Sequence, residues 1–146
     1  MNIRYMTYED LEQAAEIEAA CFREPWSKAL LAESLGSPWN LLLAAEEDGR
    51  LIGYGAVCVI AGEGEIQRIA ILEAYRQGGR GRELLAALAA AAKERGAGAM
   101  TLEVRESNQP ARRLYISAGF TEEARRKDYY RNPKEDAIIM WNRKIQ

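Results

Sequence analysis

The most informative absence in this 146-residue chain is histidine, which does not occur at all. Without histidine the chain cannot build a Ser-His or Cys-His catalytic pair, an HExxH zinc site or imidazole acid–base catalysis. Any acid–base chemistry must therefore come from glutamate, aspartate, tyrosine, lysine or cysteine side chains. We expect no bound metal.

Cysteine is scarce as well, because Cys21 and Cys58 are the only two and form no CxxC motif. The chain thus has no disulfide framework, and we expect it to work in a reducing, cytoplasmic environment. Cys58 raises the possibility of an acetyl-cysteine intermediate. It lies in an apolar segment without a neighbouring base, however, which favours a small core residue.

Long apolar runs are also missing, and none approaches the roughly 20 residues that a membrane-spanning helix needs. The first residues, MNIRYMTYED, include acidic side chains and lack the apolar centre of a signal peptide. The net charge is only −2, so no overall basic field exists to hold nucleic acid. We expect no membrane or direct nucleic-acid partner, and one domain over residues 1–146 that forms a monomer or weak dimer.

Hydrophobic periodicity predicts strands that alternate with helices. Strands are expected at residues 2–6, 40–46, 51–60, 65–72, 99–105, 120–124 and 136–143. Helices are expected from Thr7, with Asp10 completing its cap, to about Ala20; from Ser27 to about Leu35; from the loop at 76–81 to Arg95; and from Ser107 or Asn108 to Gly119. This order indicates an α/β sandwich with some parallel pairing.

A glycine-rich loop, Arg76-Gln77-Gly78-Gly79-Arg80-Gly81, lies between a predicted strand and a predicted helix. Its glycines let successive N–H groups converge on an anion, and the helix N-terminus adds a positive dipole end. Arg76, Arg80 and Arg82 add charge suited to phosphates. The loop matches neither Walker A nor a complete GxGxxG, so the residues alone leave open both a pyrophosphate cradle and an ordinary turn.

The R-x-x-G-x-G spacing of Arg76, Gly79 and Gly81 is similar to the acetyl-CoA motif of the GNAT acetyltransferases, and Ile69-Ala70-Ile71 resembles the segment before it. The resemblance implies a mixed, mostly antiparallel sheet of about seven strands with helices on both faces. It also implies a splayed parallel strand pair that holds acetyl-CoA along free backbone groups. The implied acetyl-CoA-binding residues are Ile69, Ala70, Ile71, Arg76, Gln77, Gly78, Gly79, Arg80, Gly81, Arg82 and Asn108.

A second stretch is more specific: Leu102-Glu103-Val104-Arg105, followed by Asn108, Ala111, Leu114-Tyr115 and Gly119-Phe120. It resembles the RimI-like branch of the superfamily, the ribosomal-protein-alanine N-acetyltransferases. Pro25-Trp26-Ser27, Tyr129-Tyr130 and the segment from Glu135 to Met140 extend the resemblance over nearly the whole chain. Two positions depart from the usual pattern: Glu24 replaces an aromatic or small apolar residue, and Gly78 replaces a longer polar one.

The resemblance implies direct acetyl transfer from acetyl-CoA to the N-terminal alanine of a ribosomal protein. Glu103 would be the base that deprotonates the amine, and Tyr115 the acid that protonates the leaving thiolate. A backbone N–H of the splayed strand, such as that of Ile71, would stabilise the oxyanion. The bare pattern offers other interpretations: Glu103 on an exposed strand face, Tyr115 as a core aromatic and Asn108 as a helix cap.

For the acceptor, the resemblance implies a peptide groove near Trp26, Tyr129, Tyr130 and Glu135, with the last three in the loop before the final strand. Aromatic rings and carboxylates there would grip a positively charged peptide. A solvated turn is the alternative. Two other functions stay open: a GNAT enzyme acting on a small amine, and a coenzyme A-binding module without catalysis.

Overall fold

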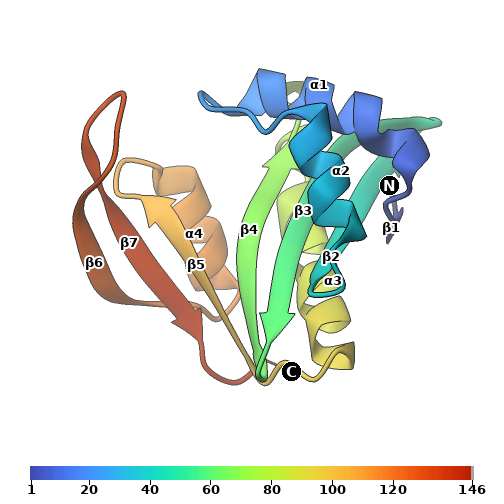
Figure 1. The fold of residues 1–146 in the computed structure, drawn as a ribbon. Helices are drawn as coiled ribbons and strands as arrows, with labels where there is room; N and C mark the ends of the chain where they lie inside the picture. Colours follow the sequence, from blue (N-terminus) through green and yellow to red (C-terminus); the bar gives the residue numbers. More distant parts are fainter. Residues whose placement is uncertain (146) are drawn as a thin grey trace.

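A mixed seven-stranded sheet forms the centre of the computed structural model, which describes residues 1–145 (Figure 1). The strand order is β1-β2-β3-β4-β5-β7-β6, and every neighbouring pair is antiparallel except β4 and β5. The strands are β1 (Asn2–Tyr5), β2 (Asn40–Glu47), β3 (Arg50–Ile60), β4 (Glu63–Ile71), β5 (Ala99–Arg105), β6 (Thr121–Tyr130) and β7 (Glu135–Asn142). The predicted sheet and element order are confirmed.

Helices cover both faces of the sheet, as predicted. They are α1 (Leu11–Cys21) and α2 (Lys28–Gly36) on one face, and α3 (Arg80–Glu94) and α4 (Gln109–Ser117) on the other, with short 3-10 turns at Tyr8–Asp10 and Glu73–Tyr75. In β2, Leu41 and Leu43 pack in the core beneath α3, whereas Leu42 and Ala44 pack in the core beneath α1 and α2. Because both faces are buried, the central strands are almost continuously apolar.

The parallel pair is splayed, which confirms the prediction. Strands β4 and β5 pair only at Glu63↔Ala99, Gly64↔Met100 and Glu65↔Thr101. Beyond these positions the two strands separate, as Figure 1 shows between β4 and β5. On its other side β4 pairs with β3 along its length, apart from a register shift that leaves Gln67 without a partner. A bulge of this kind bends the strand, and it lies where β4 turns away from β5.

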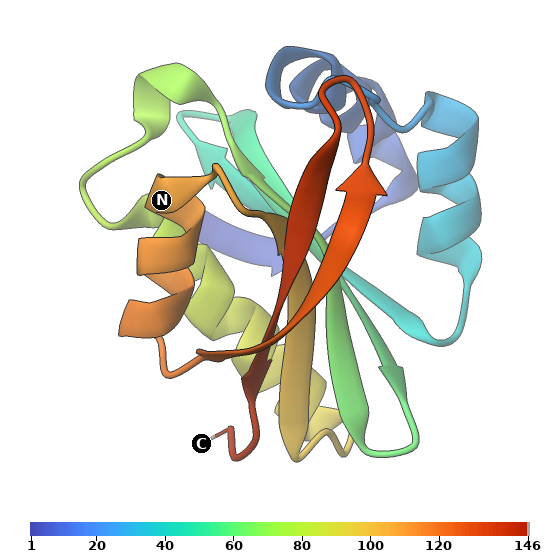
Figure 2. The same cartoon turned by 90° about the vertical axis from the view of Figure 1, so that its left-hand side faces the viewer.

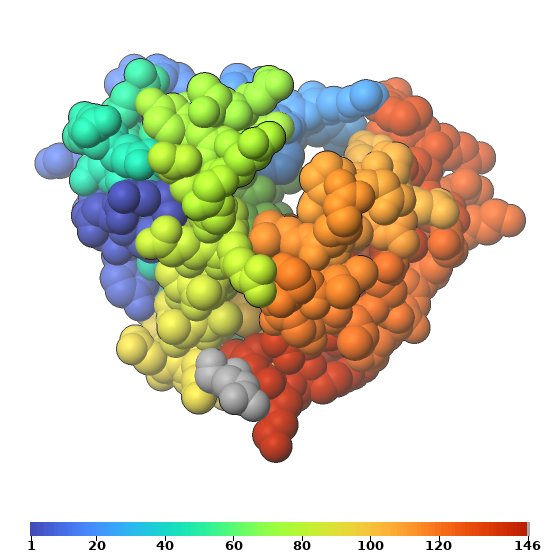
Figure 3. Space-filling view, turned by 180° about the vertical axis from the view of Figure 1, so that it is seen from behind, coloured from blue at the N-terminus to red at the C-terminus, as the bar shows by residue number. Residues whose placement is uncertain are grey.

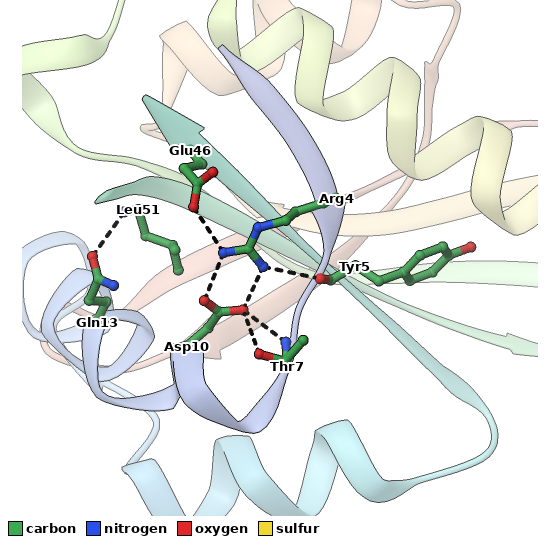
Figure 4. A network of polar contacts seen from close by, with 7 residues as sticks. All are labelled: Arg4, Tyr5, Thr7, Asp10, Gln13, Glu46 and Leu51. Atoms are coloured by element: carbon green, nitrogen blue, oxygen red, sulfur yellow. Dashed lines mark hydrogen bonds and ion pairs between the residues drawn. The ribbon is translucent and has the colours of Figure 1, made fainter. Parts of the chain in front are cut away.

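A polar network fixes the start of α1 against the sheet edge (Figure 4). Arg4 of β1 donates to both carboxylate oxygens of Asp10, at 2.8 and 2.9 Å, and to Glu46 of β2 at 3.0 Å. The Thr7 N–H donates to the same Asp10 carboxylate at 2.8 Å, so Asp10 completes the predicted cap. The hydrogen bonds from Arg4 hold the pKa of Asp10 below its usual value.

The C-terminal hairpin differs from the prediction. A short strand at 120–124 was expected, with Tyr129 and Tyr130 in a loop, but β6 runs from Thr121 to Tyr130 and both tyrosines lie at its end. This strand has no apolar face, because all its residues up to Tyr129 are exposed, so period-two patterning could not reveal how far it extends. It forms because β7 supplies backbone partners. Within residues 1–145 no helix is long and apolar enough to cross a membrane.

Candidate active site

A cleft of about 1700 Å³ opens where β4 and β5 separate. Its walls come from β4, β5, the loop before α3, the helix α4, the α1–α2 connection and the β6–β7 hairpin. Seen from behind, the surface is hollowed between the segment that precedes α3 and the helix α4 (Figure 3). The cleft therefore gathers segments that lie far apart in the sequence.

Strand β4 offers free backbone groups to this cleft. The Leu72 N–H donates to the Ile52 carbonyl at 2.8 Å, so Leu72 and Ile52 form a hydrogen-bonded pair. In an antiparallel ladder every second pair is of this kind, and Ala70 with Tyr54 is therefore the next one. The N–H and C=O groups of Ile69 and Ile71 must then point away from β3. The Ile71 carbonyl does so, because it accepts from Arg76 Nε at 2.8 Å. An extended ligand can therefore line up along Ile69–Ile71 as an added strand would.

The glycine-rich loop that follows the free edge of β4 forms an anion nest. Gln77, Gly78 and Gly79 all adopt the left-handed conformation, with φ of 78°, 71° and 81°. The first N–H of this region with a backbone acceptor is that of Glu83, bonded to Gly79, so within residues 1–145 the N–H groups of 77–82 remain free. They lie at the N-terminus of α3, a 15-residue helix whose dipole favours negative charge. These groups fit a pyrophosphate.

The loop arginines are held in three different ways. Arg76 binds the Ile71 carbonyl, whereas Arg82 donates to the Ser117 carbonyl of α4 at 3.0 Å. Arg80 forms an ion pair with Glu47 at 3.0 Å. All three nevertheless line the cleft, so they add positive potential around the nest.

Glu103 lies on β5 and lines the cleft, on the strand face shared with Thr101 and Arg105. Its side chain is 27% exposed, and the nearest cation is Arg126, whose Nε lies 3.5 Å from Oε2. That oxygen is sealed from solvent and has no hydrogen-bond partner among residues 1–145. The rest of the side chain is open to the cleft, so the carboxylate is placed where an amine proton can be taken.

Tyr115 comes from α4 and is almost completely buried, with its ring 5.9 Å from that of Phe120. It also lines the cleft, and among residues 1–145 no hydrogen-bond partner of its hydroxyl contributes to its pKa. Burial, and to a lesser extent the neighbouring Tyr130, raises the pKa of Tyr115 above the ordinary tyrosine value. The phenol therefore stays protonated at neutral pH and is available as a proton donor.

The opposite end of the cleft carries aromatic side chains. Tyr129 and Tyr130 contact each other edge to face at 5.1 Å between ring centres, and Trp26 of the α1–α2 connection lines the same cleft. Burial, followed by the charge of Glu103, raises the pKa of Tyr130 to about 12. The hairpin tip lies beside the α1–α2 connection (Figure 2), where Arg23 donates to the Asn132 carbonyl. The hydrogen bond from Arg23 therefore links the two walls of the cleft at this end.

The structure brings together nearly all of the predicted site residues. Trp26, Asn108 and the predicted residues described above line one cleft, but Gly78 and Glu135 do not. Glu135 instead bonds the Ser107 N–H at 2.7 Å and Arg105 at 3.2 Å, which fixes the turn before α4. Asn108 caps α4 by accepting from the Ala111 N–H at 3.2 Å. Among residues 1–145 no three potential metal ligands come together.

Sequence reasoning missed one conspicuous cleft residue, Arg68 of β4. Its guanidinium lies 4.1 Å from the ring centre of Phe22 and 4.6 Å from that of Trp26. No motif marks it, because its importance depends on the α1–α2 connection folding back over β4. In the sequence, nothing about Arg68 between Gln67 and Ile69 indicates that it makes these contacts.

Comparison with known proteins places these features in a family. The pattern of the acetyltransferase (GNAT) family matches residues 11–120. A [ribosomal protein bS18]-alanine N-acetyltransferase of Haemophilus influenzae is 38% identical over 134 residues, which is 90% of each chain. The N-alpha-acetyltransferase RimI of Mycobacterium tuberculosis is 35% identical over 96% of this chain and 90% of its own. The crystal structure of the Escherichia coli ribosomal-protein-S18-alanine N-acetyltransferase superposes with a TM-score of 0.88 at 33% identity, covering 96% and 91%.

Proposed function

The chain belongs to the acetyltransferase (GNAT) family, and from this premise we propose that it acetylates the N-terminal alanine of a ribosomal protein. It is an N-acetyltransferase that uses acetyl-CoA, which supplies the acetyl group when bound. The observation that carries the proposal is the single cleft in which Glu103 and Tyr115 flank the free edge of β4. The named relatives, similar over nine-tenths of the chain, support the choice of acceptor.

The donor half of the cleft fits acetyl-CoA residue by residue. The nest of free N–H groups at 77–82 suits the pyrophosphate, and the Arg76 and Arg82 guanidiniums add charge nearby. The backbone groups of Ile69 and the Ile71 N–H point away from β3 and suit the amide-containing arm, which they would bind as a strand edge binds a peptide. Asn108 lines the same half, with its amide nitrogen left over from capping α4.

Glu103 would act as the general base. A peptide α-amine has a pKa of about 7.7–8.0, so most of it is protonated at neutral pH and cannot attack. Glu103 lines the cleft with 27% of its side chain exposed, so its carboxylate can accept the proton, directly or through water. Arg126, 3.5 Å away, keeps the carboxylate oriented without hydrogen-bonding to its Oε2.

Tyr115 would act as the general acid. Its raised pKa keeps the phenol protonated, and its hydroxyl is free to donate to the departing sulfur. The Ile71 N–H, which points away from β3, would stabilise the negative charge that develops on the carbonyl oxygen. The base Glu103 and the acid Tyr115 would act on an amine and a thioester that are bound side by side. We therefore propose direct transfer rather than a cysteine intermediate. Burial raises the pKa of the Cys58 thiol, which makes it a poorer nucleophile.

At the acceptor end, Trp26, Tyr129 and Tyr130 would contact the first residues of the peptide. The hydrogen bond from Arg23 to the Asn132 carbonyl joins the α1–α2 connection to the hairpin at this end, which would favour a chain terminus over a side chain in the middle of a protein. A ribosomal-protein acceptor implies that the enzyme works in the cytoplasm, where ribosomes are assembled.

Mass spectrometry tests this acceptor assignment. The protein would be mixed with acetyl-CoA and a synthetic peptide that begins Ala-Arg-Tyr and also carries a lysine. We expect one added acetyl group, located on the α-amine by fragmentation, and no product when the N-terminus is blocked. Acetylation of the lysine side chain, or of a panel of small amines in preference to the peptide, would overturn the proposal.

A glycine substitution tests the donor half. Gly79→Ala places a side chain at φ 81°, which costs roughly 1–2 kcal/mol in the left-handed region and moves the loop N–H groups out of register. We expect the KM for acetyl-CoA to rise about tenfold, with the peptide KM unchanged. Gly49→Ala is the matched control: its φ is 78°, neither Cβ would meet an atom within 4 Å, and Gly49 lies outside the cleft. Equal effects of the two variants on the acetyl-CoA KM would contradict the nest.

A further inference from the structure

A fully buried carboxylate joins four parts of the fold next to the cleft. Glu18 of α1 is 0% exposed and accepts the Trp26 N–H at 2.7 Å, the Tyr54 hydroxyl of β3, and Arg68 of β4 at 3.2 Å. A carboxylate without partners is very costly in such a place, so these donors and Glu18 require one another. The mechanism proposed above makes no use of this group.

Arg68 transmits the position of Glu18 to the cleft wall. Besides its ion pair with Glu18, its guanidinium lies against the rings of Phe22 and Trp26 and donates to the Glu24 carbonyl at 3.1 Å. The planar guanidinium is suited to such simultaneous stacking and hydrogen bonding. One side chain of β4 thus fixes the connection Phe22–Trp26, which forms the cleft wall opposite Tyr129 and Tyr130.

We propose that Glu18 is a positioning residue for the acceptor, acting through Arg68 and the Trp26 backbone to set the wall at 22–26. The inference rests on the proposed function, because it assigns that wall to the acceptor rather than to acetyl-CoA. Loss of the Glu18 charge leaves Arg68 without its buried partner and weakens the contacts that hold residues 22–26 in place. The nest at 77–82 contains no atom of this network, so we expect the pyrophosphate contacts of acetyl-CoA to be kept when the network is weakened.

Kinetics of Glu18→Gln separate positioning from mere stability. We expect the KM for the Ala-Arg-Tyr peptide to rise about tenfold, with kcat and the KM for acetyl-CoA within about twofold. Asp10→Asn is the matched control, because Asp10 is also a buried carboxylate paired with an arginine, but its network does not line the cleft. Asp10→Asn should lower stability and leave the peptide KM unchanged.

Arg68→Lys is a milder second variant in case Glu18→Gln does not fold. It keeps a cation for Glu18 but loses the planar contacts with both rings, so we expect the peptide KM to rise about threefold. A peptide KM equal to that of the unchanged protein in every variant that folds would overturn the inference. So would a parallel rise of the KM for acetyl-CoA.

Amide hydrogen exchange gives a readout that does not depend on the acceptor. In Glu18→Gln and in Arg68→Lys, the hydrogen-bonded amides of Phe22 and Trp26 should exchange about tenfold faster, while the Glu83 amide at the start of α3 keeps its rate. If the unchanged protein does not acetylate the peptide, the proposed function fails, and exchange at Phe22 and Trp26 still tests the network. Unaltered exchange at Phe22 and Trp26 in both variants would refute the positioning role.

Discussion

Glu103→Gln is expected to lower kcat by a factor of about 10²–10⁴, the usual contribution of a general base. The substitution keeps the size of the side chain and its place on β5, but the amide cannot accept a proton from the amine. The KM for acetyl-CoA should stay within about twofold, because Glu103 lies outside the nest and the free edge of β4. Steady-state kinetics with the Ala-Arg-Tyr peptide measure both constants.

The pH dependence sharpens this test. Near and above pH of about 8 the peptide α-amine loses its proton without help, since its pKa is about 7.7–8.0. The deficit of Glu103→Gln should therefore shrink as the pH rises through that range. Glu65→Gln serves as the control, because Glu65 lines the same cleft from the facing strand β4 and should keep kcat within about threefold. A larger loss of kcat in Glu65→Gln than in Glu103→Gln would contradict the assignment of the base to Glu103 on β5.

Tyr115→Phe is expected to lower kcat by about 10²-fold, because a buried ring without its hydroxyl cannot protonate the leaving sulfur. The ring packing against Phe120 remains, so thermal unfolding should barely change. Burial raises the pKa of Tyr115, so its deprotonation should not limit activity at any pH below the ordinary tyrosine value of about 10.

Tyr130→Phe distinguishes a specific acid from a general need for tyrosine. Tyr130 lines the same cleft, and burial also keeps it protonated, with a pKa raised to about 12. We place it at the acceptor end, where Arg105 lies 4.3 Å from its ring centre. Its removal should raise the peptide KM and spare kcat. The reverse pattern, with kcat lost in Tyr130→Phe and kept in Tyr115→Phe, would make Tyr130 the acid.

Local signals predicted the helix starts and the buried strands. Ser27 caps α2 by accepting from the Leu30 N–H at 3.1 Å, as its position before the helix indicates. In α3, Leu84, Leu85 and Leu88 are all buried, as the helical spacing predicts. The start of β6 was predicted, but its extension from residue 125 to Tyr130 was not, because these residues are mostly charged and exposed and only the pairing with β7 reveals them. The single-domain extent of residues 1–146 stays a prediction.

The site residues likewise include some that the sequence could reveal and some that it could not. The glycine loop and the segment 102–120 could be recognised because their chemistry lies in consecutive residues. Glu18 could not, because in the sequence it sits in a helix of mixed glutamates and alanines, and its burial follows from Tyr54 and Arg68 arriving from other elements. The roles of Glu103 and Tyr115 remain proposals, although both side chains line the cleft.

Binding of a bisubstrate conjugate tests most directly whether one cleft holds acetyl-CoA and a peptide terminus together. Coenzyme A would be joined through the acetyl group to the α-nitrogen of the Ala-Arg-Tyr peptide, and its affinity measured by calorimetry. We predict that this conjugate binds at least about 100-fold more tightly than coenzyme A alone, because both halves of the cleft are engaged at once. An affinity no higher than that of coenzyme A, or equal to that of a conjugate joined through a lysine side chain, would contradict the account.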